Sequence, residues 1–335
     1  MSIYDVNIRK YMTAKTIAQR IEAAVGIQTP IRELVFKRSK QHPYPKIGID
    51  QIKKVVGNVP VVRRGTPAVP IKKGSRAVDE IAPDGIDLQD FITAADLNNM
   101  RLLDSVNVQG VINGVLDDML LMTKKTTEAL CAQSLTGEIK YPMKSDDGDE
   151  PYEISYVGNA SMPEYTGAVL SSSSTITDVI DVFDAMETLV QDEGWGGNVE
   201  VLAGKDVYNL VRKIVETKST KQNHVSAKME KGTIEIGGYL IRKVNASYKG
   251  YLAGGSIGTV KEIPEKSLCM VDLSAPHTLF YLALDDIDAG LQAMPFYAAP
   301  GEVKKNPSGI EIIGRSKPVP APVVSAICWF KAAMA

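Results

Sequence analysis

The chain contains few of the residues from which metal centres and disulfide frameworks are built. Its 335 residues include three cysteines and three histidines, all widely separated. No two cysteines have C-x-x-C spacing, and the histidines stand in no metal-binding pattern. Cys131, Cys269 and Cys328 each lie among apolar or small residues, so the sequence predicts three buried thiols in a reducing compartment. We expect no metal site and no cofactor.

Long apolar runs are also missing. Nothing approaches the roughly 20 consecutive apolar residues of a membrane-spanning helix, and the N-terminus lacks the continuous apolar core of a secretory signal. With 44% hydrophobic residues, 23% charged residues and a formal net charge of −2, the composition is that of a globular protein with room for two domains. The sequence therefore predicts cytoplasmic synthesis and no membrane contact.

The usual catalytic signatures are absent as well. Glycine clusters at 194–198 (GWGGN) and 254–258 (GGSIG) are similar to phosphate loops, but neither belongs to a GxxxxGK[ST] motif. Asp285, Asp286 and Asp288 could bind a metal, although acids at such spacing more often line a solvated face. No G-x-S-x-G elbow and no H-E-x-x-H helix occurs. These absences argue against an enzyme, and we expect no catalytic residues.

One segment of the chain has an unusual composition. Residues 46–76 carry eight Lys or Arg against the single acid Asp50, with short Ile/Val runs, repeated Gly and Pro, and no aromatic residue. This pattern predicts a β-ribbon, but a lone hairpin buries too little apolar surface to be stable in water. Its charge favours an acidic surface or phosphate as the partner that holds it. The candidate contact residues are Lys53, Lys54, Arg63, Arg64, Lys72, Lys73 and Arg76.

Hydrophobic periodicity predicts an α+β chain. Helical spacing is present at 12–25, 104–135, 175–191 and 205–220. Strands are expected at 138–158 as a hairpin with an acidic turn, at 198–204, at 232–246, and in four short C-terminal runs ending with a buried strand near Trp329. The basic stretch 31–45 is expected to be an extended connector, because its prolines restrict the preceding residues. A second domain is predicted to begin near residue 171.

The helix predicted at 104–135 is unusually long, about 45 to 50 Å at 1.5 Å per residue. The residues expected on its buried stripe are Val108, Ile112, Val115, Met119, Met122, Thr126 and Ala129. Gly110 and Gly114 weaken a helix interior, so a bend or close packing is expected near them.

The order of these parts resembles that of the phage major capsid protein E family, the lambda-type capsid proteins. The similarity is carried by PKIGIDQIKKVVGNVPVVRRGTPAVPI at 45–71, EIAPDGIDLQDFIT at 80–93 and PSGIEIIGRSKPVPAPVVSAICWFKA at 307–332. It implies the HK97-like capsid fold. The implied parts are an N-arm (1–45), an E-loop (46–85), a P-domain with a long spine helix (86–170 and 301–335) and an A-domain (171–300).

The resemblance also implies a function. The chain would be a major capsid protein that self-assembles into hexamers and pentamers, forming the icosahedral shell around the double-stranded DNA of a tailed phage. The candidate basic residues would contact the adjacent subunit. The helical pattern begins within about a dozen residues of Met1, which leaves no room for a cleaved scaffolding segment, so a separate scaffolding protein is expected. A portal, a decoration protein and nonspecific contact with packaged DNA are further expected partners, with synthesis in the host cytoplasm.

Two other readings stay open. The basic ribbon could bind nucleic acid, although without an aromatic residue it has no side chain on which bases stack. Residues 171–300 could instead form an α/β enzyme. That reading predicts a monomer or small oligomer, whereas the capsid reading predicts megadalton particles.

Overall fold

The structure of the chain is a computed structural model. It describes Gln19 and residues 27–48, 80–101, 105–145, 148–157, 162–218, 227–252 and 255–334. The helix predicted at 12–25, apart from Gln19, lies outside the described residues. Most of the basic segment lies outside them too. No helix in the described part is long and apolar enough to cross a membrane.

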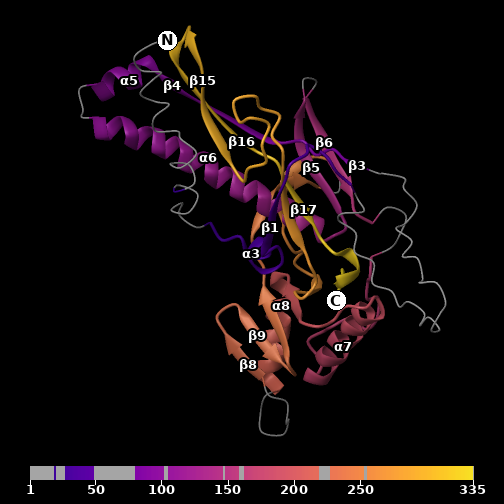
Figure 1. The fold of residues 1–335 in the computed structure, drawn as a ribbon. Helices are drawn as coiled ribbons and strands as arrows, with labels where there is room; N and C mark the ends of the chain where they lie inside the picture. Colours follow the sequence, from indigo (N-terminus) through magenta and orange to yellow (C-terminus); the bar gives the residue numbers. More distant parts are fainter. Residues whose placement is uncertain are drawn as a thin grey trace, which may run out of the picture.

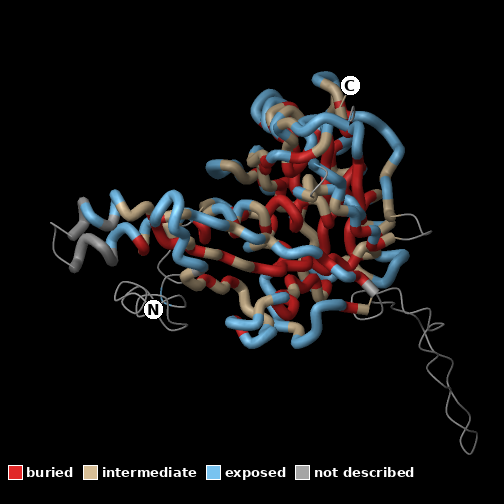
Figure 2. The backbone as a smooth tube through the Cα atoms, turned by 90° about the horizontal axis from the view of Figure 1, so that it is seen from above, coloured by how far each residue is buried: buried red, intermediate tan, exposed pale blue. Residues whose placement is uncertain are grey.

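The longest element is helix α6 (Ser105–Ser134), which confirms the predicted long helix. Its N-terminal half and helix α5 (Ala94–Arg101) project from the body of the molecule, and its C-terminal end enters that body (Figure 1). Figure 2 shows that the buried backbone is concentrated in the body, whereas much of the projecting end is exposed.

The buried face of α6 differs in part from the predicted stripe. Met119 is buried as expected, but Met122 is 58% exposed. Thr123 and Thr127 are buried instead, because each hydroxyl donates to a carbonyl one turn earlier, at 2.9 Å and 2.8 Å, and so enters the core with its hydrogen bond satisfied. No described atom lies within 4 Å of a Cβ built on Gly110 or Gly114. Of the bend or close packing expected there, close packing is not found among the described residues, and the bend stays a prediction.

A three-stranded antiparallel sheet packs on the projecting half of α6. Its strands, in order, are β15 (Tyr297–Lys305), β16 (Ser308–Ser316) and β4 (Ile86–Thr93). Ile112 and Leu116 of α6 meet Ile92 and Ile312 from this sheet, and Phe296 just before β15, in one apolar cluster. The contact holds the helix against a layer made from two distant parts of the sequence.

A six-stranded sheet forms the second body. Its strands, in order, are β18 (Ile327–Phe330), β13 (Leu268–Asp272), β7 (Val199–Ala203), β10 (Tyr239–Lys243), β9 (Thr233–Ile236) and β8 (Ala227–Glu230). Helices α7 (Ile176–Asp192) and α8 (Lys205–Lys218) confirm the predicted α/β unit. Thr175 begins α7 with a capping box, in which its hydroxyl accepts from Asp178 N at 3.1 Å.

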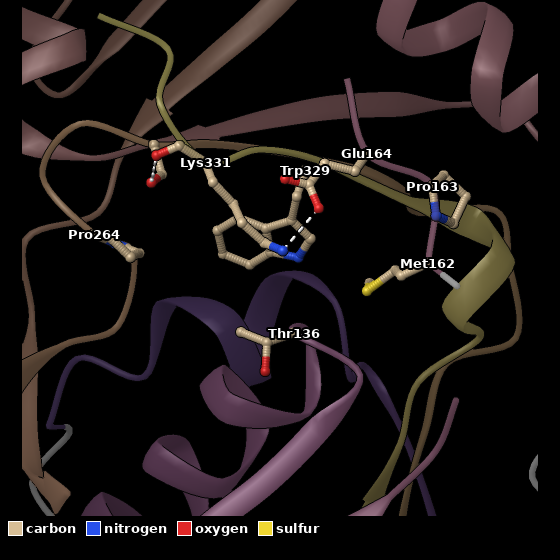
Figure 3. Close-up of a pocket in the computed structure, with 8 residues that line it drawn as sticks. Thr136, Met162, Pro163, Glu164, Pro264, Trp329 and Lys331 are labelled. Atoms are coloured by element: carbon tan, nitrogen blue, oxygen red, sulfur yellow. Dashed lines mark hydrogen bonds and ion pairs between the residues drawn. The ribbon is translucent and has the colours of Figure 1, made fainter. Parts of the chain in front are cut away.

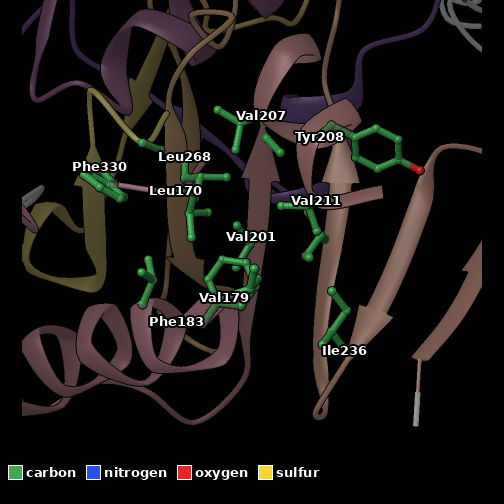
Figure 4. Close-up of a cluster of buried hydrophobic side chains, with 14 of the residues drawn as sticks. Leu170, Val179, Phe183, Val201, Val207, Tyr208, Val211, Ile236, Leu268 and Phe330 are labelled. Atoms are coloured by element: carbon green, nitrogen blue, oxygen red, sulfur yellow. The ribbon is translucent and has the colours of Figure 1, made fainter. Parts of the chain in front are cut away.

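The central strands of this sheet are buried on both faces. Successive side chains of a strand point to opposite sides. Val201 and Ala203 pack in one cluster with Phe183 of α7 and Val211 of α8 (Figure 4). Leu202 lies in the cluster on the other side, with the C-terminal end of α6. The sheet is thus the middle layer between two sets of helices, and the buried closing strand predicted near Trp329 is confirmed as β18.

The connector predicted at 31–45 is wrong in part. Residues Pro30–Leu34 form the short helix α3, and strand β1 (Arg38–His42) pairs in parallel with β14 (Thr278–Leu282). Proline suits the first turn of a helix, where its missing N–H costs nothing. Ile31 is fully buried beside α6. The tertiary contact, rather than local propensity, makes this segment helical.

Four further pairings complete the described fold. Strand β17 (Pro318–Ala321) pairs with β14, and β2 (Ile47–Gly48) pairs with β3 (Glu80–Ile81). The hairpin of β5 (Glu138–Ser145) and β6 (Gly148–Ser155) confirms the one predicted at 138–158. A second hairpin joins β11 (Ser247–Tyr251) to β12 (Ile257–Lys261), and a 3-10 turn (Val324–Ala326) precedes β18.

Candidate functional site

The seven basic residues proposed as contacts all lie between residues 49 and 79, outside the described residues. The structure does describe where this segment leaves the body and returns. Ile47 pairs with Ile81, and Gly48 with Glu80, in an antiparallel register. Both isoleucines are buried in an apolar cluster that includes Leu130 of α6. The 31 residues between Gly48 and Glu80 therefore start and end at one anchored point.

The anchored base sets how far the segment reaches. A chain of 31 residues that leaves and returns at one point can reach at most about half of its extended length. At about 3.3 Å per extended residue, that upper limit is roughly 50 Å.

The backbone amides of the glycine-rich loop at 194–198 bind a side chain of the protein itself. The fully buried carboxylate of Asp272 accepts from Gly196 N at 2.7 Å, Gly197 N at 3.0 Å and Asn198 N at 3.1 Å. The amide and hydroxyl of Ser274 also donate to it, at 2.8 Å and 2.7 Å. Burial alone would raise the pKa of Asp272, but these hydrogen bonds outweigh burial and lower it. An internal anion thus takes the place that a phosphate would need, and the loop has a structural role.

His277 is held next to this carboxylate as a neutral side chain. Its Nε2–H donates to the Asp272 carbonyl at 3.0 Å, and its Nδ1 accepts from Val323 N at 3.0 Å. Burial lowers the pKa of His277 to about 4. The ring joins β13 to the segment before β18, so it is structural rather than catalytic.

Two buried carboxylates, Glu128 of α6 and Glu262 just after β12, lie close enough to repel each other. Glu128 of α6 accepts from Ile31 N at 2.7 Å and Arg32 N at 2.9 Å, and so caps α3 from 97 positions away. Burial raises the pKa of Glu128 to about 7. Burial, followed by repulsion from Glu128, raises the pKa of Glu262 to about 8. Glu262 Oε2 has no hydrogen-bond partner among the described residues. Sequence reasoning missed this pair, because its members are 134 positions apart.

A cavity of about 320 Å³ lies where the C-terminal end of α6 meets β18 (Figure 3). The indole of Trp329 forms one wall and donates from Nε1 to the Leu135 carbonyl at 2.7 Å. At the rim, Lys331 and Glu164 neutralise each other in an ion pair of 2.7 Å. The wall of the cavity is mostly apolar, and the charges of Lys331 and Glu164 are paired with each other. Among the described residues, no group of three or more Asp, Glu, His and Cys is placed to hold a metal ion.

Comparison with known proteins adds to this geometry. A sequence model described as phage major capsid protein E matches residues 13–332. A comparison with curated proteins gives no sequence match.

Solved structures are similar over nearly the whole chain. A prophage protein of Escherichia coli CFT073, assigned as a capsid protein, is 14% identical with a TM-score of 0.60, covering 97% of this chain and 99% of that one. An encapsulin of Synechococcus elongatus PCC 7942 is 10% identical with a TM-score of 0.48, covering 98% and 95%. A chain from the procapsid of satellite phage P4, in a structure that includes the size determination (Sid) protein, is 12% identical with a TM-score of 0.45, covering 96% and 99%. The prophage protein shows the fold, and the predicted α+β, HK97-like architecture is confirmed.

Proposed function

Because this chain belongs to the phage major capsid protein E family, whose model matches residues 13–332, we propose that it assembles into hexamers and pentamers. The family match carries the conclusion that the chain is a shell-forming capsid protein of the virion. The finer proposal is that these capsomers close an icosahedral shell around the double-stranded DNA of a tailed phage. The protein acts as a building block and not as an enzyme.

The anchored basic segment supports a head-to-tail contact between copies. One copy would extend residues 46–76 onto the next, and the next would do the same in turn. When two different surfaces of identical chains bind each other, each added copy is rotated by the same angle relative to the last. A closed ring forms when these rotations add up to a full turn. Surface ion pairs contribute little singly, so the Ile and Val residues of the segment would supply most of the stability.

The division of the chain is part of this proposal. It comprises the N-arm (1–45), the E-loop (46–85), the P-domain (86–170 and 301–335) and the A-domain (171–300). The layer of α6 with β4, β15 and β16, and the six-stranded sheet with α7 and α8, support two main bodies. Strand pairing joins the proposed parts to one another. In the A-domain, β14 pairs with β1 of the N-arm and β17 of the P-domain, and β13 pairs with β18 of the P-domain.

The remaining partners follow from the same proposal. A separate scaffolding protein and a portal would act during assembly, and a decoration protein could bind the finished shell. Packaged DNA would be contacted without sequence specificity, through charge neutralisation. The chain would be synthesised in the host cytoplasm, with no cofactor and no membrane contact.

Reversal of charge at the proposed contact is expected to block assembly. Arg63→Glu together with Arg64→Glu changes the charge of the segment by four units. Like charges would then face each other across the contact, which costs several kcal/mol per contact. We expect the yield of shells, measured by sedimentation, to decrease about tenfold or more. Arg212→Glu with Lys213→Glu is the matched control, since it makes the same change on the exposed side of α8. Equal shell yields for wild type and the Arg63/Arg64 variant would refute the contact.

A further inference from the structure

Strand β1 and the residue before it form an exposed, basic stretch of chain. Lys37, Arg38 and Lys40 are exposed, and so are Ser39 and Gln41 beside them. No acid occurs between residues 34 and 49. Within the described part of the chain, none of these three basic side chains forms an ion pair. Their charges are therefore available to an anionic partner.

The fold holds this stretch in an extended form. Val35 and Phe36 are buried just before it, and Ile47 is buried after it. Between these anchors, β1 (indigo in Figure 1) pairs in parallel with β14. It pairs with no second strand among the described residues and so forms an edge of its sheet. The basic side chains thus stand on an anchored strand with one open backbone edge.

The strand spaces its polar side chains regularly. Successive side chains point to opposite faces of a strand, so Arg38 and Lys40 share one face and Ser39 and Gln41 the other. Two residues of a strand cover roughly 6.6 Å. Side chains of all four types donate hydrogen bonds to phosphate oxygens in protein–DNA complexes. The strand therefore presents a row of donors suited to a phosphate backbone.

Acids close to this stretch offset little of its charge. The loop after β14 lies next to it, because Ala283 N donates to the Tyr44 carbonyl at 3.3 Å. In this loop, Asp285 and Asp286 are paired with basic side chains of the body. Asp288 is exposed. A single exposed acid of the loop thus stands against three unpaired basic side chains, and the surface stays positive.

The composition of the surface favours DNA over an acidic protein. The cores of protein–protein interfaces are rich in aromatic residues and poor in Lys. The exposed residues 37–41 include no apolar side chain. Protein–DNA interfaces are more polar and much more positive. Tyr44, which follows the strand, is 66% exposed, but one ring provides no platform for successive unpaired bases. A duplex is therefore the better partner.

We propose that β1 binds the phosphate backbone of double-stranded DNA through Lys37, Arg38 and Lys40. The inference deepens the proposed function and rests on it for the source of the DNA, which is the genome inside the shell. Phosphate contacts carry no sequence information, so the binding is independent of sequence. Each contact releases condensed counterions, and the affinity therefore falls steeply as the salt concentration rises.

Fluorescence anisotropy with a labelled DNA duplex of arbitrary sequence tests this site on the full-length, unassembled chain. The affinity is measured over a series of salt concentrations for wild type and for the triple variant Lys37→Ala, Arg38→Ala, Lys40→Ala. We expect the variant to bind at least about tenfold more weakly at low salt. The slope of log affinity against log salt should become shallower by about 2.7, because each phosphate contact contributes about 0.9.

A matched control makes the same change of charge and residue type on exposed positions of α8. It combines Lys205→Ala, Arg212→Ala and Lys213→Ala. This control is expected to keep the affinity and the salt slope of wild type. If the alanine variant of β1 lowers the unfolding temperature, glutamine at the same three positions keeps long polar side chains and is expected to give the same shallower slope.

Three results would overturn the proposal. A β1 variant with the wild-type salt slope would show that the phosphate contacts lie elsewhere. A β1 variant that binds the duplex normally but no longer binds poly-glutamate would show that the strand accepts an acidic protein. A preference for single-stranded DNA that Tyr44→Ala abolishes would show that the partner is not a duplex.

Failure of this inference can be distinguished from failure of the proposed function, because DNA binding is measured without assembly. If the chain forms shells but its DNA binding does not depend on β1, the inference is wrong and the capsid function stands. If the chain binds DNA through β1 but forms no shells with its cognate scaffold, the proposed function is wrong and the DNA site stands.

Discussion

Asp272→Ala is expected to destabilise the protein strongly, lowering its unfolding temperature and its soluble fraction. The substitution removes the acceptor of three loop amides and of both Ser274 donors, all close to a fully buried position. A donor left buried without a partner costs about 1–3 kcal/mol, but Gly197, Asn198 and Ser274 are exposed residues, so water can replace part of their bonding. Since whole proteins are stable by about 5–15 kcal/mol, a loss of a few kcal/mol is still a large fraction of the total stability. The soluble fraction and the unfolding temperature measure the effect.

Two further variants make the Asp272 result specific. Asp272→Asn keeps one acceptor oxygen but turns an NH₂ group toward the other donors, so we expect an intermediate loss of stability. Asp288→Ala removes an exposed carboxylate, and it should change the unfolding temperature little. A soluble Asp272→Ala protein that unfolds at the wild-type temperature would show that the GWGGN loop does not depend on this anion.

Glu128→Ala is expected to detach α3 from α6. The variant removes the acceptor for Ile31 N and Arg32 N, and nothing in the local sequence replaces it, since Thr29 provides no side-chain cap. We expect faster amide exchange at both residues by at least tenfold, equivalent to about 1.4 kcal/mol. Glu128→Gln keeps one acceptor and should show a smaller effect. Wild-type exchange rates in Glu128→Ala would contradict the cap.

Glu128 and Glu262 predict a loss of stability as the pH rises from about 4.5 to about 8. The pKa values of Glu128 and Glu262 are raised in the folded state, to about 7 and about 8, from a usual value of 4.5. Above pH 4.5 the folded state therefore holds more protons than the unfolded state, and its stability falls as the pH rises through 7 and 8. The limit is about 1.4 kcal/mol per pH unit for each group.

Chemical denaturation between pH 6 and pH 9 measures this dependence on the unassembled chain. Glu262→Gln, which cannot ionise, is expected to flatten the decrease. His277 gives the opposite dependence of stability on pH in the acidic range. Its pKa is lowered from 6.5 to about 4 in the folded state, so stability falls as the pH falls below 6.5. If wild type and Glu262→Gln lost the same free energy between pH 6 and pH 9, the buried carboxylate would not be the cause.

The sequence alone predicted those helices and strands whose pattern lies within a short run of consecutive residues. Helix α6, helix α7 and the strand around Val201 were predicted because their hydrophobic periodicity lies within a few residues. The helix α3 was missed, because its cap is Glu128, 97 positions away. The burial of Thr123 was missed, because a hydroxyl can satisfy itself on the preceding turn.

The candidate site was predicted less well than the fold. The phosphate-loop alternative for GWGGN was judged by motif alone, and its decisive partner, Asp272, is 74 or more positions distant. The basic contact residues stay a prediction, because all seven lie outside the described part of the chain. Their function depends on a second molecule, which neither the periodicity nor the folding of one chain specifies.

Electron microscopy of the purified chain, with sedimentation velocity on the same sample, tests the central claim most directly. The chain should be produced alone and together with its cognate scaffolding protein. We predict closed shells, capsomer rings or polymerised sheets, and sedimentation of megadalton particles. A homogeneous monomer or small oligomer under both conditions would contradict the assignment of this chain as a shell-forming protein.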